Sequence, residues 1–415
     1  LVPIYWLRGI RYGKSRRGIR ERLGYFSAEQ LQRLQQKPVL WIHAVSVGET
    51  RAAAPLLRAL RKKYPDYQLL LTNVTETGHA VALKNRDVDC CLFFPFDFSW
   101  TVRRVLQAVC PELVVIVETE IWPNFIRQAN LLGIPLVLVN GRISDRSFPR
   151  YRLVRPVLRP ILQSFTALCM QSQMDAERIA QLGAINTQLE NTGNLKFDHE
   201  PRDISSAEVA QLKQTYCLPE EVAILVAGST HAGEEEQLLS VYKKLLEQGR
   251  KLILVLIPRH PERCREVQSL LVENGIAGHL RSSLSESKQP LQAGEVLLVD
   301  TLGEVLNLYA VSEIVFVGGS LVPVGGHNLL EASLLGKPVL FGPHVQNFRE
   351  ISAKLIRAGA GVQVMNQQEL ERQSILMLDD PIRCRAMGQA GRSLIAENAG
   401  ATERTMQRIT RCLKN

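Results

Sequence analysis

Glycines and two polar side chains gather in one short segment near the end of the sequence. The segment Gly318 to Ala332 holds two glycine pairs and then Asn328 and Glu331. The apolar run Ile314 to Val317 before it predicts a buried strand, and the pattern after it predicts a helix from about Asn328. Glycine lets a phosphate approach the backbone, and free amides at a helix start favour an anion. The segment therefore predicts a nucleotide or phosphate site, with a tight turn in an α/β core as the alternative.

Three other loops follow predicted strands in the same half of the chain. They are Gly228–His231, Ile257–Pro261 and Asp300–Glu304. The carboxyl ends of parallel strands meet at one edge of a sheet, so the four loops are expected to converge there. Arg259 supplies a forked cation for a phosphate, and Asn328 and Glu331 could bind ribose hydroxyls or a base edge.

A carboxylate in the first half could act as a base. Glu49 ends the turn Ser46–Glu49, between a predicted strand, Val39–Ile42, and a predicted helix, Arg51–Tyr64. A helix amino terminus stabilises a carboxylate, so simple capping is one interpretation. The functional interpretation is a general base that takes a proton from an acceptor hydroxyl.

Two more glutamates, Glu118 and Glu120, follow the predicted strand Leu113–Val117. If the strand continues, its alternation points them to opposite sides, so only one would face a ligand. The alternative is a pair of solvated acids at the end of a strand.

Metal binding and serine-type nucleophilic catalysis are not indicated. His231 with Glu234 to Glu236 has a metal-ligand composition, but the spacing fits no closed site, and an exposed acidic helix start is preferred. The chain also lacks a G-x-S-x-G nucleophile elbow.

The elements that must position these residues alternate between strand and helix patterns. This rhythm predicts two doubly wound parallel α/β domains with a cleft between the carboxyl ends of their sheets. A polar stretch, Gly193 to Arg202, interrupts the rhythm and marks a linker. The predicted parts are a basic membrane-proximal segment at 1–25, an acceptor-binding domain at 26–193, a linker at 194–205, a nucleotide-sugar-binding domain at 206–396 and a C-terminal helix at 397–415.

Net charge and composition limit the classes of molecule that the protein is expected to bind. The chain has 415 residues and a net charge of +9, with 46% hydrophobic and 22% charged residues, which is a globular balance. Basic residues cluster within 1–25 and again among six arginines between Arg142 and Arg159. Such patches suit anionic lipids or phosphates, or are ordinary solvated surface. Nucleic acid is disfavoured, because aromatic residues are only 6% and no recognition motif occurs.

The cysteines and the first residues bear on the cellular compartment. None of the eight cysteines has C-x-x-C spacing, which favours reduced thiols over disulfides or zinc. The apolar segment Leu1–Leu7 is shorter than the roughly 20 residues that span a bilayer. It is interpreted either as the remnant of an anchor or as an ordinary apolar helix start.

Five motifs together resemble a known family. They are similar, in the same order along the chain, to motifs of the 3-deoxy-D-manno-octulosonic acid (Kdo) transferases of lipopolysaccharide assembly. The five segments are Trp41–Glu49, Glu118–Asn124, Gly141–Ser147, Pro258–Arg263 and Gly325–Glu331. The resemblance covers essentially the whole chain.

This resemblance implies a GT-B fold and an inverting transfer of Kdo from CMP-Kdo to a lipid A precursor (lipid IVA), with no cofactor and no tightly bound metal. It implies attachment to the cytoplasmic face of the bacterial inner membrane, peripheral or through the N-terminus. By the family's motifs Glu49 is the base, and Glu118, with Glu120 as the alternative, assists the transition state together with Lys196. The implied CMP-binding residues are Pro258, Arg259, Leu302, Gly303, Glu304, Asn328, Leu329, Leu330 and Glu331.

Two other functions remain open from the sequence. One is a GT-B enzyme that uses another sugar nucleotide, such as a UDP-sugar transferase or epimerase. The other is a non-catalytic, nucleotide-gated membrane adaptor, in which basic patches bind lipid and Glu49 only caps a helix.

Overall fold

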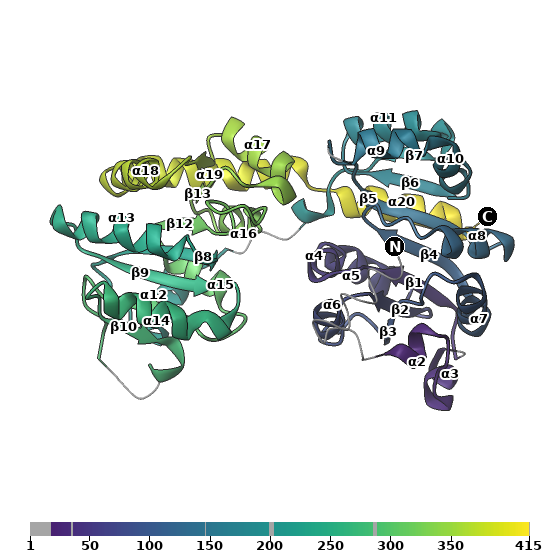
Figure 1. Cartoon of the computed structure of the whole chain (residues 1–415), viewed down its shortest axis with the longest axis horizontal. Coiled ribbons are helices and arrows are strands. Elements are labelled where there is room, and N and C mark those ends of the chain that lie inside the picture. Colours follow the sequence, from purple (N-terminus) through teal and green to yellow (C-terminus); the bar gives the residue numbers. More distant parts are fainter. Residues whose placement is uncertain (1–17, 35, 146, 199–202, 285–288, 415) are drawn as a thin grey trace. The chain divides into compact units, whose positions relative to one another are not determined.

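The computed structural model describes residues 18–34, 36–145, 147–198, 203–284 and 289–414. The chain divides into two compact units, Leu1–His199 with Asn398–Asn415, and Glu200–Glu397 (Figure 1). Each unit is built on a seven-stranded sheet whose neighbouring strands all run parallel, as the alternating pattern predicts. Most of the basic segment at 1–25, and Arg146 of the second basic cluster, lie outside the described residues.

The first sheet has the strand order β3-β2-β1-β4-β5-β6-β7. The chain reverses its direction of winding between β1 and β4, and such a switch point is where open α/β sheets leave a crevice for a ligand. The strands are β1 (Val39–His43), β2 (Gln68–Asn73), β3 (Cys90–Phe93), β4 (Pro111–Val117), β5 (Leu136–Gly141), β6 (Ala167–Met170) and β7 (Leu189–Asn191).

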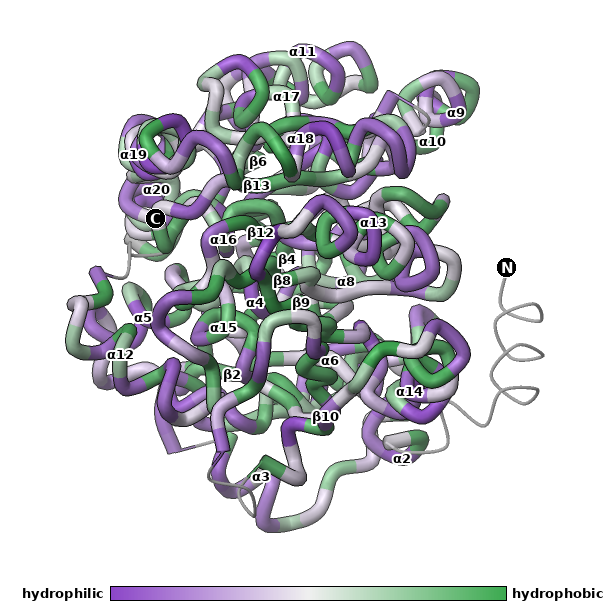
Figure 2. Tube along the Cα trace, turned by 90° about the vertical axis from the view of Figure 1, so that its left-hand side faces the viewer, coloured by the Kyte–Doolittle hydropathy of each residue, from purple (hydrophilic) through white to green (hydrophobic). Residues whose placement is uncertain are grey.

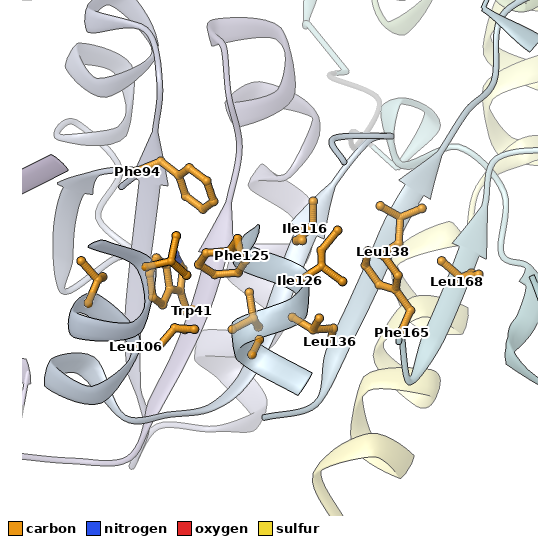
Figure 3. Packing of buried hydrophobic residues seen from close by; sticks show 14 of the residues in the cluster. Trp41, Phe94, Leu106, Ile116, Phe125, Ile126, Leu136, Leu138, Phe165 and Leu168 are labelled. Atoms are coloured by element: carbon orange, nitrogen blue, oxygen red, sulfur yellow. The ribbon is translucent and has the colours of Figure 1, made fainter. Parts of the chain in front are cut away.

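Alternating side chains of the first sheet fill two apolar layers. Trp41 packs on one face of β1 and Ile42 on the other. Trp41 meets Phe125 edge to face at 5.2 Å, and Figure 3 shows both among the aliphatic side chains of this layer. One face carries α7 (Ser99–Val109), α8 (Pro123–Leu131), α10 (Arg155–Gln163) and α11 (Gln173–Leu182), and the other carries α5 (Ala54–Lys63), α6 (Glu76–Ala82) and α20 (Ala401–Lys414).

The second sheet has the order β10-β11-β9-β8-β12-β13-β14, with its own switch point between β8 and β12. Its strands are β8 (Ala223–Thr230), β9 (Leu252–Pro258), β10 (Gly278–Leu280), β11 (Val296–Leu298), β12 (Ile314–Val317), β13 (Val339–Phe341) and β14 (Gly361–Gln363). Its helices are α12 (Ser206–Thr215), α13 (Glu235–Glu247), α14 (Cys264–Glu273), α15 (Val305–Val311), α16 (Leu330–Leu334), α17 (Arg349–Arg357), α18 (Gln367–Asp379) and α19 (Pro381–Asn398). In Figure 2 hydrophobic residues run along the strands β12 and β13, whereas the helices around them carry both hydrophilic and hydrophobic residues.

Two segments differ from the sequence-based expectation. The helix predicted over Arg51–Tyr64 is two helices, α4 (Val47–Ala52) and α5, because the first turn of α5 contains Pro55, which has no amide hydrogen to continue a helix. The stretch predicted as a linker at 194–205 is packed into the first unit over its first residues, where Leu195 and Phe197 are buried in a 3-10 turn, Leu195–Phe197. The division between the two units falls after His199.

The C-terminal helix belongs to the first unit. Asp198 accepts hydrogen bonds from the amides of Gly400 (2.8 Å), Ala401 (3.2 Å) and Thr402 at the start of α20. This carboxylate satisfies amides that the helix itself leaves unpaired. Lys63 of α5 donates to Thr410 at 2.8 Å and ties the other half of α20 to the same unit.

Candidate active site

The side chain of Glu49 folds back onto the turn that precedes its own helix. The carboxylate accepts hydrogen bonds from the Val45 amide (2.6 Å to Oε2) and from the Ser46 hydroxyl (2.9 Å to Oε1). Ser46 is the N-cap residue of α4, and Glu49 is only 8% exposed. The turn follows β1 directly, so the carboxylate is held at the switch point of the first sheet.

The surroundings of Glu49 hold its acid–base equilibrium near neutrality. Burial, together with the charges of Glu118 and Glu120, raises the pKa of Glu49 to about 7, while the hydrogen bonds from Val45 and Ser46 act in the opposite direction. A carboxylate with such a pKa is a far better proton acceptor at neutral pH than an ordinary solvated glutamate. Both capping and base chemistry are therefore open to the same side chain.

Glu118 stands in an uncommon backbone conformation. It is the first residue after β4 and has φ 62°, in the left-handed region that costs a non-glycine residue about 1–2 kcal/mol. Its own amide still donates to the Val139 carbonyl at 2.9 Å. The strand ends here, so the alternation expected for Glu118 and Glu120 does not apply, and the charges of both act on Glu49.

Glu120 is the second unusual acid of this cluster. Burial, with a smaller contribution from the charge of Glu118, raises the pKa of Glu120 to about 7. Sequence reasoning preferred Glu118 for the family's role, but the structure brings both acids to the same place. Glu118 forms an ion pair with Lys196, whereas Glu120 is a half-buried acid with a raised pKa.

Lys196 completes the cluster from a distant part of the chain. Its ammonium lies 3.1 Å from Oε1 of Glu118, and the two side chains are 18% and 26% exposed. The short turn that carries Lys196 is anchored to the ends of the sheet, because the Leu195 amide donates to Asn140 (3.0 Å) and Asn194 donates to Gln171 (3.1 Å). The predicted linker residue is thus rigidly placed beside the predicted catalytic acids.

The glycine-rich loop of the second unit is held by a buried acid. Glu234 is fully buried and accepts amide hydrogen bonds from Gly319 (2.7 Å), Ser320 (2.9 Å), Leu321 (2.9 Å) and His231 (3.0 Å). These amides are therefore not free for a phosphate, contrary to the simplest sequence interpretation. The expected exposed acidic helix start is wrong for Glu234 and Glu235, which are 0% and 1% exposed, and holds only for Glu236.

Three loops of the second unit each contribute a histidine to one cluster. His231 follows β8, His260 follows β9, and His327 lies in the glycine-rich loop after β12. Nε2 of His231 and Nε2 of His327 are 2.8 Å apart, and the rings of His231 and His260 meet edge to face at 6.1 Å. The sequence analysis placed these residues in loops that follow strands and weighed only His231, as a metal ligand, so it did not predict that the three histidines form a cluster.

Arg259 lies beside this histidine cluster. Its amide donates to the carbonyl of Thr230 at 3.0 Å, which joins the ends of β8 and β9, and its side chain is exposed. Burial first, and then the charge of Arg259, lowers the pKa of His327 to about 4. The predicted phosphate ligand thus lies where two of the predicted loops meet.

The remaining residues that were predicted to bind the nucleotide differ in their contacts and burial. Glu304 pairs with Arg281 (2.9 Å) on the β10 side of the sheet, and Asn328 donates to Glu331 at 3.3 Å. The helix predicted from Asn328 begins at Leu330 and has five residues. Pro258, Leu329 and Leu330 are buried, so Leu329 and Leu330 could reach a ligand only through their backbone, whereas Leu302 and Gly303 are exposed.

No three side chains of histidine, cysteine, aspartate or glutamate in the described ranges form a group that could hold a metal ion.

Known proteins identify the family. The family model described as 3-Deoxy-D-manno-octulosonic-acid transferase (kdotransferase) matches residues 17–199. The 3-deoxy-D-manno-octulosonic acid transferase of Haemophilus influenzae is 34% identical over 402 residues, covering 96% of this chain and 92% of that protein. The protein of the same name from Bordetella pertussis is 35% identical over 382 residues, covering 89% and 86%.

A solved structure supports the fold independently. The glycosyltransferase from Rickettsia africae ESF-5 superposes with a TM-score of 0.62 at 13% identity, covering 92% of this chain and all of that one. Identity this low indicates shared architecture only. With the sequence relatives, it leads to one conclusion: the chain belongs to the 3-deoxy-D-manno-octulosonic acid transferase family and is a glycosyltransferase with the GT-B fold.

Proposed function

We propose that the enzyme transfers Kdo from CMP-Kdo to a hydroxyl of a lipid A precursor by a single inverting displacement, with Glu49 as the general base. The observation that carries this proposal is the buried carboxylate of Glu49, fixed by Val45 and Ser46, whose pKa is raised to about 7. A carboxylate that only capped a helix would be favoured in its ionised form and would have a lowered pKa.

The proposed step moves one proton and exchanges one glycosidic bond. The acceptor hydroxyl gives its proton to Glu49, and its oxygen forms a bond to the anomeric carbon of Kdo. The bond between that carbon and the phosphate oxygen breaks, and CMP leaves with the electron pair. Attack on the face opposite CMP inverts the configuration, and no cofactor is needed to balance the reaction.

Cations are proposed to stabilise the charge that develops in this step. Arg259 offers a fork of donors that suits the phosphate of CMP, and Lys196 is a second cation for the transition state. Glu118 holds Lys196 at 3.1 Å and so sets the position of its ammonium. Because Glu234 occupies the amides of Gly319 to Leu321, we assign the phosphate to Arg259 rather than to those amides.

The lipid acceptor and the membrane are proposed to meet the helices α9 (Phe148–Leu153) and α10. Leu153 and Val157 are 83% and 65% exposed there. The helices α7 to α10 contain no aspartate or glutamate, and their exposed arginines include Arg150, Arg152, Arg155 and Arg159. Exposed apolar groups among arginines are typical of surfaces that bind anionic lipids.

This surface underlies the proposed location, attached to the cytoplasmic face of the bacterial inner membrane. No helix within the described ranges is long and apolar enough to cross a bilayer. The proposed partners are accordingly a CMP-sugar, a lipid A precursor and an anionic membrane surface, without nucleic acid.

Incubation of the protein with CMP-Kdo and lipid IVA, followed by mass spectrometry of the lipid, tests the proposal. Glu49→Gln is expected to lower the transfer rate by about 10²–10⁴-fold while CMP still binds. Glu112→Gln, which changes an exposed glutamate outside the cluster, is the matched control. Wild-type turnover by Glu49→Gln would remove Glu49 as the base. Product from a UDP-sugar instead, or no product despite binding of both ligands, would favour the two alternative functions.

A further inference from the structure

A buried arginine connects the short helix α2 (Ile19–Arg22) to the first sheet. Arg22 is only 5% exposed, although it ends a basic stretch of sequence. Its helix is fastened to the end of β3 on two sides, because the Phe93 amide donates to Glu21 (3.2 Å) and the Phe96 amide donates to the Arg22 carbonyl (3.0 Å). Burying a guanidinium is costly unless it is hydrogen-bonded, so its partners indicate what it does.

The Arg22 guanidinium holds the ends of two strands. Nη2 donates to the carbonyl of Val74 (2.5 Å) and Nη1 to that of Phe94 (3.5 Å), the residues that directly follow β2 and β3. The guanidinium also lies over the Phe93 ring, 4.6 Å from its centroid. These contacts place the cation at the carboxyl edge of the sheet, on the same edge as the Glu49 turn.

A continuous set of hydrogen bonds through the backbone of two turns leads from the Arg22 side chain to the Glu49 side chain. The amides of Val74 and Thr75 both donate to the Val45 carbonyl at 3.1 Å. The Val45 amide in turn donates to Oε2 of Glu49 at 2.6 Å. The turn is also closely packed from the side of α6, since a Cβ on Gly78 would lie 3.1 Å from the carbonyl carbon of Ser46.

We propose that Arg22 is a positioning residue for Glu49: by fixing the Val74–Thr75 peptide, it fixes Val45 and hence the carboxylate that Val45 holds. This inference rests on the proposed function of Glu49. It makes the docking of α2 against the first sheet a condition for a correctly oriented base, so this helix and the chemistry are coupled through the edge of the sheet. The alternative is that Arg22 only anchors α2.

Positioning of Glu49 and simple anchoring of α2 predict different dependences of the transfer rate on pH. The difference lies in the acid limb, the pH range in which the rate rises as Glu49 loses its proton. The Val45 amide favours the ionised form of Glu49, so a displaced Val45 would raise the pKa of Glu49 further. The charged groups around Glu49 are Glu118 and Glu120, which raise its pKa, and Lys196, which pairs with Glu118. The charge of Arg22 acts on His43 and His79, and both histidines have pKa values lowered mainly by burial, while the charge of Glu21 acts on His79 in the opposite direction.

The test compares Arg22→Met and Arg22→Lys with Arg20→Met, which removes an exposed charge from the same helix. Transfer by the full chain is measured against pH with saturating donor and acceptor, and folding is followed by circular dichroism. We expect Arg22→Met to lower kcat about tenfold near neutral pH with little change in KM, and to move the acid limb upward by about one pH unit. Arg22→Lys, which keeps the positive charge, should show a smaller upward shift. Arg20→Met should have the kcat and the pH profile of the wild type.

If Arg22→Met folds and has the same kcat and the same acid limb as the wild type, the inference is overturned. If Arg22→Met does not fold, Arg22→Lys decides: a limb displaced upward supports the positioning role, and a wild-type limb refutes it. A shift that disappears when His79→Gln is added would assign the limb to His79 and also overturn it. Glu49→Gln separates the two proposals. Full activity of Glu49→Gln would refute the proposed function itself. An inactive Glu49→Gln together with an unshifted acid limb in the Arg22 variants would refute only the positioning role of Arg22.

Discussion

The ammonium of Lys196 lies 3.1 Å from the carboxylate of Glu118, although 78 residues separate them in the sequence. Their pairing joins a turn after β7, the last strand of the first sheet, to the residue that directly follows its central strand β4. Because Glu118 also raises the pKa of Glu49, the ion pair moderates the charge that the proposed base experiences.

Replacing Lys196 with methionine should therefore impair catalysis more than stability. The variant loses a transition-state cation and leaves Glu118 uncompensated, so we expect the transfer rate to fall at least about tenfold. Partly exposed ion pairs contribute only about 0–1 kcal/mol, so the melting temperature should change little. Lys244→Met, which breaks the 2.9 Å pair with Glu371 in the second unit, is the control. Equal rates for both variants would remove Lys196 from the mechanism.

The raised pKa of Glu49 predicts how stability depends on pH. Its pKa is about 7 in the folded protein against 4.5 for an ordinary glutamate, so the folded state binds a proton that the unfolded state releases between these values. Stability contributed by the protonated acid is present below pH 4.5 and is lost as pH rises toward 7, up to about 3 kcal/mol.

Glu49→Gln cannot ionise, so its stability relative to wild type should increase from pH 5 to pH 8. Denaturant unfolding of both proteins across this range measures the difference. A difference that stays constant with pH would show that the acid titrates normally, and a decrease would show that its pKa is depressed.

Glu234 should hold the glycine-rich loop of the second unit. In Glu234→Gln one acceptor oxygen becomes an NH₂ group that faces backbone donors, so we expect a loss of about 2 kcal/mol in the free energy of unfolding. CMP binding should weaken as the loop loosens. Glu236→Gln changes an exposed neighbour and is the control. Chemical denaturation and calorimetry measure the two effects, and a fully stable Glu234→Gln would contradict the structural role.

Arg259→Ala should weaken the binding of CMP by about tenfold to a hundredfold, because a charge-assisted hydrogen bond contributes roughly 1.5–3 kcal/mol. Arg265→Ala removes another exposed arginine from the same unit. Titration calorimetry with CMP compares the two. Unchanged affinity in Arg259→Ala would refute its assignment to the phosphate.

Charge reversal on α9 and α10 should release the protein from anionic vesicles. Each basic residue near such a surface contributes about 1 kcal/mol, so Arg152→Glu with Arg155→Glu should weaken binding at least about tenfold. Arg357→Glu with Arg385→Glu makes the same charge change in the second unit. Vesicle flotation with and without anionic lipid measures the effect, and identical flotation of the two double variants would count against this lipid-binding surface.

Local patterns predicted most of the sheets, because buried parallel strands are short apolar runs such as Leu252–Pro258. The short strands β7, β10 and β14 went unpredicted, since their sequences LEN, GHL and GVQ do not form the apolar run that marks a buried strand. The break between α4 and α5 depends on Pro55, which could have been recognised from the sequence.

By itself the sequence determined the two α/β units, the family and the identity of the acids and cations, because these depend on residue type and local spacing. Only the tertiary structure decided that Glu118 leaves β4 in a left-handed conformation, that Lys196 meets it, and that Glu234 fills the amides of the glycine-rich loop. Burial, long-range hydrogen bonds and the summed field of neighbouring charges arise only when distant segments pack together, and these set the protonation of Glu49.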